Sequence, residues 1–522
     1  MASDTTERIL IYLVRRELRI TDNPILHHIS ELLAKDQAPF THLLPVYVFP
    51  ARQVETCGFL NPATATASPY PPARSVVAGF PRCGPHRAKF WAESVWEFKK
   101  NLEILGSGLV IRVGRIDEIL EHILDDFQQG RGDGVAGDGH QVKREVIGVW
   151  FTDEEGVAEK TDERNVFRVA GLKKVPVRKW KDEKYLVDDR DLPYMTPKDV
   201  PDSFAEFRMT AGSLRTASRK PLPRPARLPP LPKHIPAQPV PFEVPDTLAD
   251  WIAGLLKPLR DASVATDIAT RSPTSVPEHT YIGGEAYALE RLEHLISHGS
   301  ISTTYAGDNR STSLAAWLAL GCITARQINE YLLDFEDGGT TLGQHVDGYS
   351  AGENERTAGI RTELLWRDYL RLCTRKHGYK LFRLEGFKSD TERVWKYGDE
   401  PETKRQIQRF IEGRTGVPDV DAALREMYLT GYTSESQRYR AAIYFGRQLG
   451  IDWRIGAEWF EYCLIDYDVS GNWGSWQYCA GVANDPTWEF NPLRRGGYVA
   501  TWVDSADERA PQSNVREVQL SR

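Results

Sequence analysis

The sequence predicts an N-terminal α/β domain with a doubly wound, parallel (Rossmann-like) sheet, followed by a C-terminal all-helical domain. Short apolar runs alternate with helical patterns through the first 180 residues, which is typical of a parallel sheet covered by helices on both faces. From about residue 284 onwards, apolar residues recur at helical spacing almost throughout. The expected divisions are an α/β domain over 1–200, a proline-rich linker over 201–280, a helical domain over 281–505 and a disordered tail over 506–522.

Five runs in the first domain predict strands buried on both faces, because they are short, continuous and apolar. They are Ile9–Val14, Leu43–Phe49, Leu109–Val113, Val146–Phe151 and Val175–Trp180. Helical patterns lie between them, and Asn23 before Pro24 predicts a capped helix start after the first strand. The glycine-rich tract Gly130–Gly139 predicts a loop insertion.

The predicted linker is defined by its composition. Residues 201–240 contain nine prolines, and seven Lys or Arg against two acids. Because proline prevents regular hydrogen bonding, we expect an extended connection that wraps between the two domains. Its positive charge could contact phosphate, but a solvated linker is the simpler interpretation.

Seven stretches after the linker have helical apolar spacing, and glycines punctuate their ends. They are Glu285–Ile296, Leu314–Leu320, Thr362–Cys373, Lys404–Ile411, Val420–Leu429, Gln437–Leu449 and Ala457–Tyr462. Tryptophan is concentrated in this region, where nine of the 14 lie between Trp317 and Trp502. A hydrophobic core alone does not require that density.

Composition excludes several classes of protein. Hydrophobic residues make up 41% and charged residues 27%, which indicates a globular chain. No apolar run reaches the roughly 20 residues of a membrane span, and six cysteines without a CxxC pair argue against a structural zinc or other metal site. The net charge of −7 limits nucleic-acid binding to a local patch. MASDTTER at the N-terminus shows no organellar targeting pattern, so we expect a cytoplasmic or nuclear protein. We also expect a monomer.

Polar residues share apolar surroundings with the tryptophans of the helical region. Glu363 and Arg367 lie on one helix face, where they either bind a ligand or form a surface ion pair. The hydroxyl residues within 310–314 precede a helix, where they either cap it or hold an anion. Asp466 and Asp468 have no histidine nearby, so they suit hydrogen bonds to a large polar cofactor better than a metal.

Several motifs, in order, resemble the photolyase/cryptochrome family. They are YLVRRELRITDNP, ELLWRDY, TGVPDVDAALREMYLTGY, IDWRIGAEWF and LIDYDVSGNWGSWQYCAGVANDP. The segments GAEWFE, LIDYD and GNWGSWQYCAGVANDP resemble the DASH cryptochrome branch in particular. The resemblance runs from Ile9 to about Trp502, apart from insertions near 130–140 and 210–280.

The resemblance implies an FAD molecule held in the helical domain. Asn472 matches the side chain beside flavin N5, where an amide supplies no proton and therefore favours a reduced anionic flavin. The family continues its phosphate-binding turn with Ser-Pro, where this chain has Ala315-Ala316, so one phosphate contact is expected to be missing. The other positions that match FAD-binding residues are Thr312, Ser313, Leu314, Glu363, Arg367, Arg438, Asp466 and Asp468.

Three tryptophans match the family's electron relay: Trp476 next to the flavin, Trp453 in the middle and Trp395 toward the surface. Taken singly, each is as easily a core aromatic residue. In the α/β domain the family holds an antenna chromophore, often a reduced folate such as 5,10-methenyltetrahydrofolate. Glu155 matches a glutamate that contacts this folate.

The substrate mouth departs from the family pattern. Glu363 and Trp366 match residues at the pocket into which photolyases flip a cyclobutane pyrimidine dimer. After TGY the family pattern resembles MSNRGRQ, whereas this chain has Glu435, Ser436 and Tyr439 where Asn, Arg and Gln are expected. An anion and a hydroxyl thus replace an amide and a cation that face DNA, which weakens attraction for phosphate.

Two functions are consistent with these residues, and both use FAD and the relay. The first is a DASH-type blue-light photoreceptor that signals to an unidentified partner, with weak or lost repair. The alternative is a light-driven carbon–carbon lyase, a deoxyribodipyrimidine photolyase, acting on dimers in single-stranded DNA. The substitutions at the mouth favour the first. A flavoprotein that has lost both roles is a third reading.

Overall fold

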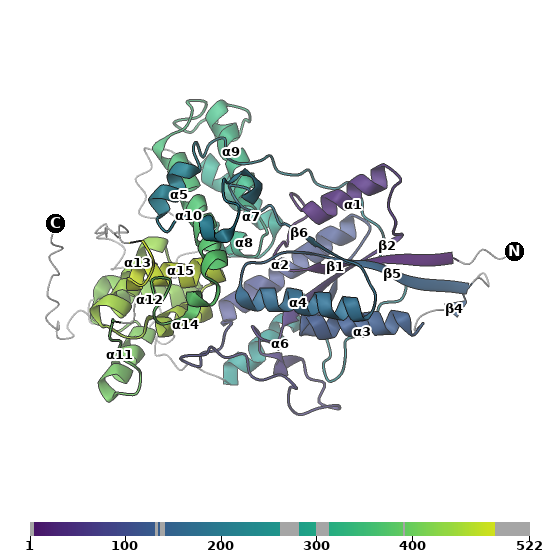
Figure 1. Cartoon of the computed structure of the whole chain (residues 1–522), viewed down its shortest axis with the longest axis horizontal. Helices are drawn as coiled ribbons and strands as arrows, with labels where there is room; N and C mark the ends of the chain where they lie inside the picture. The colour runs from purple at the N-terminus through teal and green to yellow at the C-terminus, as the bar shows by residue number, and fades with distance from the viewer. Residues whose placement is uncertain are drawn as a thin grey trace.

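The computed structural model describes residues 5–130, 134–135, 141–261, 281–298, 313–389 and 392–485. In Figure 1 the α/β domain lies at the right and the helical domain at the left. The expected fold class of both domains is confirmed. The tail expected over 506–522 lies outside the described residues.

A single sheet forms the centre of the α/β domain. Its strand order is β3-β2-β1-β5-β4, and β6 also pairs with β5. Every pairing is parallel except that of β4 with β5. The strands are β1 (Thr5–Val14), β2 (His42–Pro50), β3 (Val110–Gly114), β4 (Gly134–Val135), β5 (Gln141–Thr152) and β6 (Val177–Trp180). All five predicted runs are strands, and the tract predicted as a loop contains the short β4.

Alternate residues of β1 pack against opposite helical layers, as the doubly wound arrangement requires. Ile9 and Ile11 pack with α3 and α4, whereas Leu10 and Tyr12 pack with α1 and α2. The Asn23 side chain accepts backbone hydrogen bonds at the start of α1, so the predicted cap is confirmed. The four helices are α1 (Pro24–Ala34), α2 (Pro85–Ile104), α3 (Ile116–Gln128) and α4 (Val157–Leu172).

The connection over 201–280 is not extended throughout, contrary to the expectation from its prolines. It contains α5 (Phe204–Thr210) and α6 (Leu248–Asp261). Trp251 of α6 is 1% exposed, and its ring centroid lies 4.9 Å from that of Phe49 and 4.6 Å from that of Phe59. Helix α6 forms because its apolar residues recur at helical spacing and complete the core of the α/β domain.

The helical domain is joined to the α/β domain by buried charged groups. The Glu285 carboxylate accepts hydrogen bonds from the backbone N–H groups of Ile20 (2.8 Å) and Thr21 (2.9 Å). Arg326 Nε donates to Asp22 over 2.8 Å. Charge-assisted bonds of this kind hold the domains in a fixed relation. The helices are α7 (Glu285–Ser297), α8 (Ala315–Ala319), α9 (Ala325–Asp337), α10 (Glu355–His377), α11 (Pro401–Ile411), α12 (Pro418–Thr430), α13 (Glu435–Ile443), α14 (Trp453–Cys463) and α15 (Val469–Ala480).

Candidate functional site

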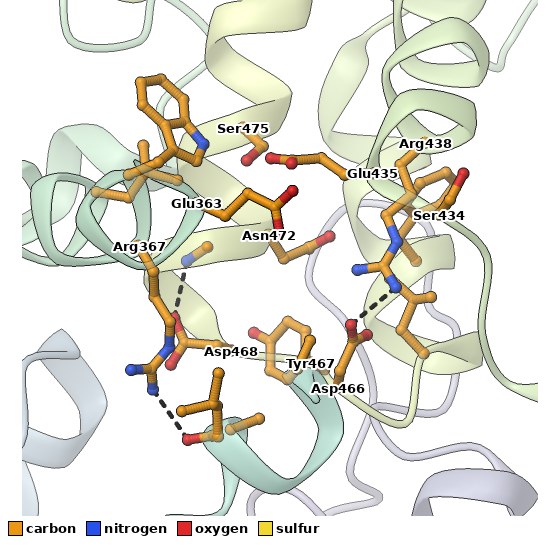
Figure 2. Close-up of a pocket in the computed structure, with 18 of the residues that line it drawn as sticks. Glu363, Arg367, Ser434, Glu435, Arg438, Asp466, Tyr467, Asp468, Asn472 and Ser475 are labelled. Carbon is orange, nitrogen blue, oxygen red and sulfur yellow. Dashed lines mark hydrogen bonds and ion pairs between the residues drawn. The ribbon is translucent and has the colours of Figure 1, made fainter. Parts of the chain in front are cut away.

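A cavity of about 360 Å³ lies among α8, α10, α13, α14, α15 and the loop that precedes α15. Its volume is in the range usual for sites that bind cofactors. Figure 2 shows charged, amide and hydroxyl side chains from these elements converging on the same space. The chain segments that line it are far apart in the sequence, so the fold is what brings them together.

Asp466 is the most deeply buried acid of this cavity. It is 7% exposed, and its Oδ2 accepts a hydrogen bond of 2.8 Å from Arg438 Nη2. Arg438 Nε also donates to the backbone oxygen of Thr433 (2.8 Å), which fixes the guanidinium group. Asp466 Oδ1 has no hydrogen-bond partner among the described residues. A buried carboxylate oxygen without a partner is costly unless a ligand supplies a donor.

Arg367, Asp468 and Asn472 line the cavity as expected. Arg367 Nη2 donates to the backbone oxygen of Leu318 (2.9 Å), while its buried Nη1 has no partner within the described part of the chain. The Asp468 side chain caps the start of α15. Asn472 Nδ2 donates to the backbone oxygen of Ala457 (3.0 Å), so α14 fixes the orientation of this amide.

The expected phosphate-binding turn is described only in part. Thr312 lies outside the described residues, whereas Leu314 lines the cavity. Ser313 is buried and has a φ of 56°, a left-handed backbone conformation that is uncommon for a residue other than glycine. The Trp366 indole also lines the cavity, and its buried Nε1 has no partner over the described ranges.

The three residues that depart from the family pattern also line the cavity: Glu435, Ser436 and Tyr439. The Tyr439 hydroxyl donates a hydrogen bond to Glu435. Glu363 and Glu435 are both exposed where they face the cavity. Desolvation by the surrounding protein, together with the Glu435 carboxyl, raises the pKa of Glu363 to about 8. Desolvation also raises the pKa of Glu435.

Trp476 and Trp453 lie on neighbouring helices behind the cavity. Trp476 lines the cavity and is 2% exposed, and its Nε1 has no partner among the residues that the structure describes. Gly456 of α14 packs directly against its ring. Trp453, one turn before Gly456, is fully buried and donates a hydrogen bond of 3.1 Å to the backbone oxygen of Leu384. Helix α14 therefore carries Trp453 close to the contact with Trp476.

Trp395 is held beside the start of α14. Lys396 N donates to the oxygen of Gly450 (2.8 Å), and Asp452 N donates to the oxygen of Lys396 (3.0 Å). Trp395 was expected toward the surface, and its neighbour Val394 is 90% exposed, but the Trp395 ring itself is only 5% exposed. The Arg393 guanidinium lies 4.4 Å above that ring and covers it.

Sequence reasoning missed several residues of the site. Ser434, Tyr467 and Ser475 line the cavity. Ser475 is three residues after Asn472 on α15, so helical spacing was the signal that could have found it. Tyr467 lies between the two predicted acids, but an aromatic residue there is more often part of the core.

Glu155 belongs to an ion-pair network between the two domains. Its carboxylate lies 3.3 Å from Arg371 Nη1 and 3.4 Å from Arg375 Nε. The adjoining cavity measures about 20 Å³, which is room for little more than one water molecule. With the side chains in these positions, the cavity is too small for a folate. The folate antenna stays a prediction.

Comparison with known proteins gives matches over both domains. A family model described as the FAD binding domain of DNA photolyase matches residues 360–516, and one described as DNA photolyase matches residues 10–130. A putative cryptochrome DASH of Gibberella zeae is 42% identical, over 95% of this chain and 73% of the relative. Cryptochrome DASH of Xenopus laevis is 32% identical, over 95% of this chain and 82% of the relative.

Solved structures of cryptochromes and photolyases have a similar fold. A cryptochrome of Synechocystis sp. superposes with a TM-score of 0.70 at 26% identity, covering 96% of this chain and 89% of that one. A class III photolyase of Agrobacterium tumefaciens has a TM-score of 0.61 at 18% identity, covering 94% and 84% of the two chains. At that lower identity the second comparison shows the shared fold alone.

The expected location in the cytoplasm or nucleus is contradicted. A relative from Neurospora crassa is named mitochondrial, and relatives from Ostreococcus tauri and Arabidopsis thaliana are named chloroplastic/mitochondrial. The expectation rested on the composition of a few N-terminal residues, which is weak information about an organelle. No helix in the described ranges is both long and apolar enough to cross a membrane.

The unpartnered groups of the cavity fit FAD. Asp466 Oδ1 can accept a hydrogen bond from a cofactor hydroxyl or ring N–H, and the Arg367 and Trp366 nitrogens can donate to cofactor oxygens. The matched FAD-binding domain begins within α10 and includes α11 to α15, and these helices supply most of the lining, so the cofactor expected from the sequence is confirmed. The chain binds FAD and belongs to the cryptochrome DASH branch of the photolyase/cryptochrome family.

Proposed function

We propose that the protein is a blue-light-responsive flavoprotein whose FAD is photoreduced through Trp476, Trp453 and Trp395, and in which dimer repair is weak or absent. The flavin supplies light absorption and accepts the electron. The indole of Trp476 lies at the cavity wall, where it can give up an electron without first losing a proton. Trp453 and Trp395 follow along α14 and its neighbouring segment, so that one long transfer is divided into short steps.

The cofactor is oriented by charged groups that the protein holds in place. Arg438 and Asp466 form a fixed pair on one side of the cavity. Arg367, bonded to the backbone of Leu318, lies on the other side with one N–H group unused among described residues. Such preorganised groups cost little when the ligand binds, because their side chains are already ordered.

The position of Glu435 carries the proposal of weak repair. Its carboxyl lies in the same cavity as Glu363, and Ser436 stands where the family pattern has a cation. A phosphate-bearing strand that approaches this mouth meets two acids, and it finds a hydroxyl in place of a charge-assisted donor at 436. Binding of a flipped dimer is therefore weakened, whereas photoreduction does not use these contacts.

The alternative is a photolyase active on single-stranded DNA. Membership of the photolyase family supports a lyase of this kind, and Glu363 and Trp366 both line the cavity as the dimer pocket requires. We rank it second because those two residues serve any ligand of the mouth, whereas Glu435 and Ser436 act against phosphate.

Two measurements on the same purified protein separate these functions. Absorption spectra in the dark and under blue light, with an external thiol reductant, report photoreduction. Repair of a cyclobutane dimer in a single-stranded oligonucleotide reports lyase activity. We expect bleaching of the flavin band without repair at a comparable rate. Efficient repair would establish the photolyase instead, and a flavin that does not respond to light would exclude both.

A further inference from the structure

Two carboxyl groups from different helices face each other in the FAD cavity. Glu363 projects from the middle of α10, and Glu435 is the first residue of α13. Figure 2 shows the two side chains directed toward one another, with Ser475 and Asn472 on either side. The Glu435 carboxylate opposes ionisation of Glu363.

The other charged groups around the pair do not neutralise it. Arg356 acts on Glu363 from the same helix, but its effect is smaller than those of desolvation and of Glu435. Arg438 acts on Glu435, but it already forms the pair with Asp466. Arg367 and Asp468 lie farther along the same cavity. Among the described residues, the one neutral group that donates a hydrogen bond to the pair is the Tyr439 hydroxyl, which donates to Glu435.

We propose that Glu363 and Glu435 hold one proton between them at neutral pH, and that this proton passes to the flavin ring when the ring has taken up an electron. This rests on the photoreduction proposed above. Like-charged carboxyls at close range cannot both ionise easily, so one of them stays protonated. Desolvation raises the pKa of both groups, and the Glu435 carboxyl adds to the rise for Glu363, whose pKa is about 8.

The transfer balances in charge. One electron from a thiol reductant reaches the ring through the tryptophans and leaves the ring with one additional negative charge. One proton then leaves the carboxyl pair, so that the ring becomes neutral and the pair carries two negative charges. Solvent returns a proton to the pair afterwards. Asn472 cannot donate this proton, because an amide is not an acid in this pH range.

Glu435 makes this chain different from the family pattern, which has an amide at that position. With an amide there, Glu363 would have no acidic neighbour and would ionise more readily. The exchange thus adds a second carboxyl beside Glu363, which favours retention of a proton there.

Infrared difference spectra, light minus dark, test the proposal on FAD-loaded protein at pH 7 with a thiol reductant. Recorded with time resolution, the wild type should lose the carbonyl stretch of a protonated carboxylic acid before solvent returns the proton, and its visible spectrum should gain the long-wavelength absorption of a neutral, one-electron-reduced flavin. In Glu363→Gln that infrared band should fall at least about tenfold, and in Glu435→Gln it should be weaker than in the wild type, because desolvation alone then keeps the proton on Glu363. Asp419→Asn, at an acid outside the cavity that pairs with Arg440, should match the wild type.

A pH series on the wild type gives a second test that does not depend on variants. The infrared band should disappear reversibly with a midpoint near the pKa of Glu363, about 8. Bleaching of the blue flavin band reports photoreduction separately, so failure of the proposed function is seen as no bleaching at all. Bleaching without the carboxylic band, or a band of wild-type size in both Gln variants, would overturn the shared proton.

Discussion

Gly456 and Trp476 are packed so closely that a Cβ atom added at Gly456 would lie 2.2 Å from the nearest atom of the indole ring. The next ring atoms would be 2.7 Å and 2.9 Å away. Gly456 belongs to α14 and Trp476 to α15. Close approach of these two helices therefore determines where the first tryptophan of the relay stands relative to the FAD cavity.

Replacing Gly456 with Ala should displace the Trp476 ring. We expect a loss of stability of about 1–3 kcal/mol from overpacking, with less FAD retained and slower photoreduction. Thermal unfolding and the rate of flavin bleaching measure these effects. Gly359→Ala is the matched control, because a Cβ there meets nothing within 4 Å and alanine favours a helix by up to about 1 kcal/mol. Equal behaviour of the two variants would show that the contact is unimportant.

Replacing Trp453 with Phe should leave FAD binding intact and slow photoreduction by about tenfold or more, because the middle member of the relay becomes hard to oxidise. Flavin bleaching under blue light with a thiol reductant checks this. Trp473 contacts Trp453 edge-to-face with ring centroids 5.8 Å apart, so Trp473→Phe is the control for a change next to the relay. An unchanged rate in Trp453→Phe would mean that electrons bypass this residue.

Replacing Asp466 with Asn should lower FAD retention about tenfold and reduce stability by about 1–3 kcal/mol, because the charge-assisted bond to Arg438 is weakened. Flavin released on denaturation, compared with protein concentration, gives the occupancy. The control is Asp452→Asn, which alters a similar buried acid outside the cavity. Asp452 Oδ2 accepts a hydrogen bond of 2.7 Å from Arg454 Nη2. That control should lose stability but keep its FAD; a parallel loss of FAD would indicate general unfolding.

The double change Glu435→Asn with Ser436→Arg should strengthen binding to dimer-containing single strands. A gained charge-assisted contact is worth about 1.5–3 kcal/mol, or roughly tenfold to a hundredfold in affinity. Binding at several salt concentrations measures this, since a new phosphate contact steepens the salt dependence. Glu435→Asn alone separates the amide from the cation. If the wild type already binds and repairs as well as the double variant, these positions do not control the mouth.

Asp189 should make stability depend on pH in the acid range. Burial alone would raise its pKa, but the guanidinium groups of Arg371 and Arg375 outweigh burial and hold the pKa well below its usual range. Its contribution is therefore complete above the unfolded pKa of about 3.9 and is lost as the pH falls. Asp189→Asn should be less stable than the wild type by about 1–3 kcal/mol at pH 7, and the difference should shrink below about pH 4.

Urea unfolding over pH 3–7 measures this difference. Glu402→Gln is the control, because Glu402 forms a surface pair with Arg405 and is 57% exposed. Such a pair is worth less than about 1 kcal/mol. A difference between Asp189→Asn and the wild type that stays constant with pH would contradict the assignment.

The sheet and most helices could be predicted from the sequence because their apolar patterns report burial directly. Helix α6 was not predicted, because the many prolines before it outweighed the helical spacing of Trp251 and Leu255. Local composition also does not reveal that a later segment completes an earlier core. The FAD positions came from motifs, and seven of them line one cavity: Leu314, Glu363, Arg367, Arg438, Asp466, Asp468 and Asn472. The approach of Glu363 to Glu435 was beyond the sequence, because it depends on how α10 and α13 pack. Burial of Trp395 under Arg393 likewise depends on tertiary contacts.

The return of α6 to the α/β domain bears on how the protein is made. Trp251 packs against Phe49 and Phe59, yet it is synthesised long after the last strand of the sheet. A nascent chain that has just released β6 from the ribosome therefore shows an open aromatic surface, which is a site for chaperones or for aggregation. Autonomous folding of the first domain should begin only after Asp261 has emerged, and a fragment that ends at residue 200 should be insoluble.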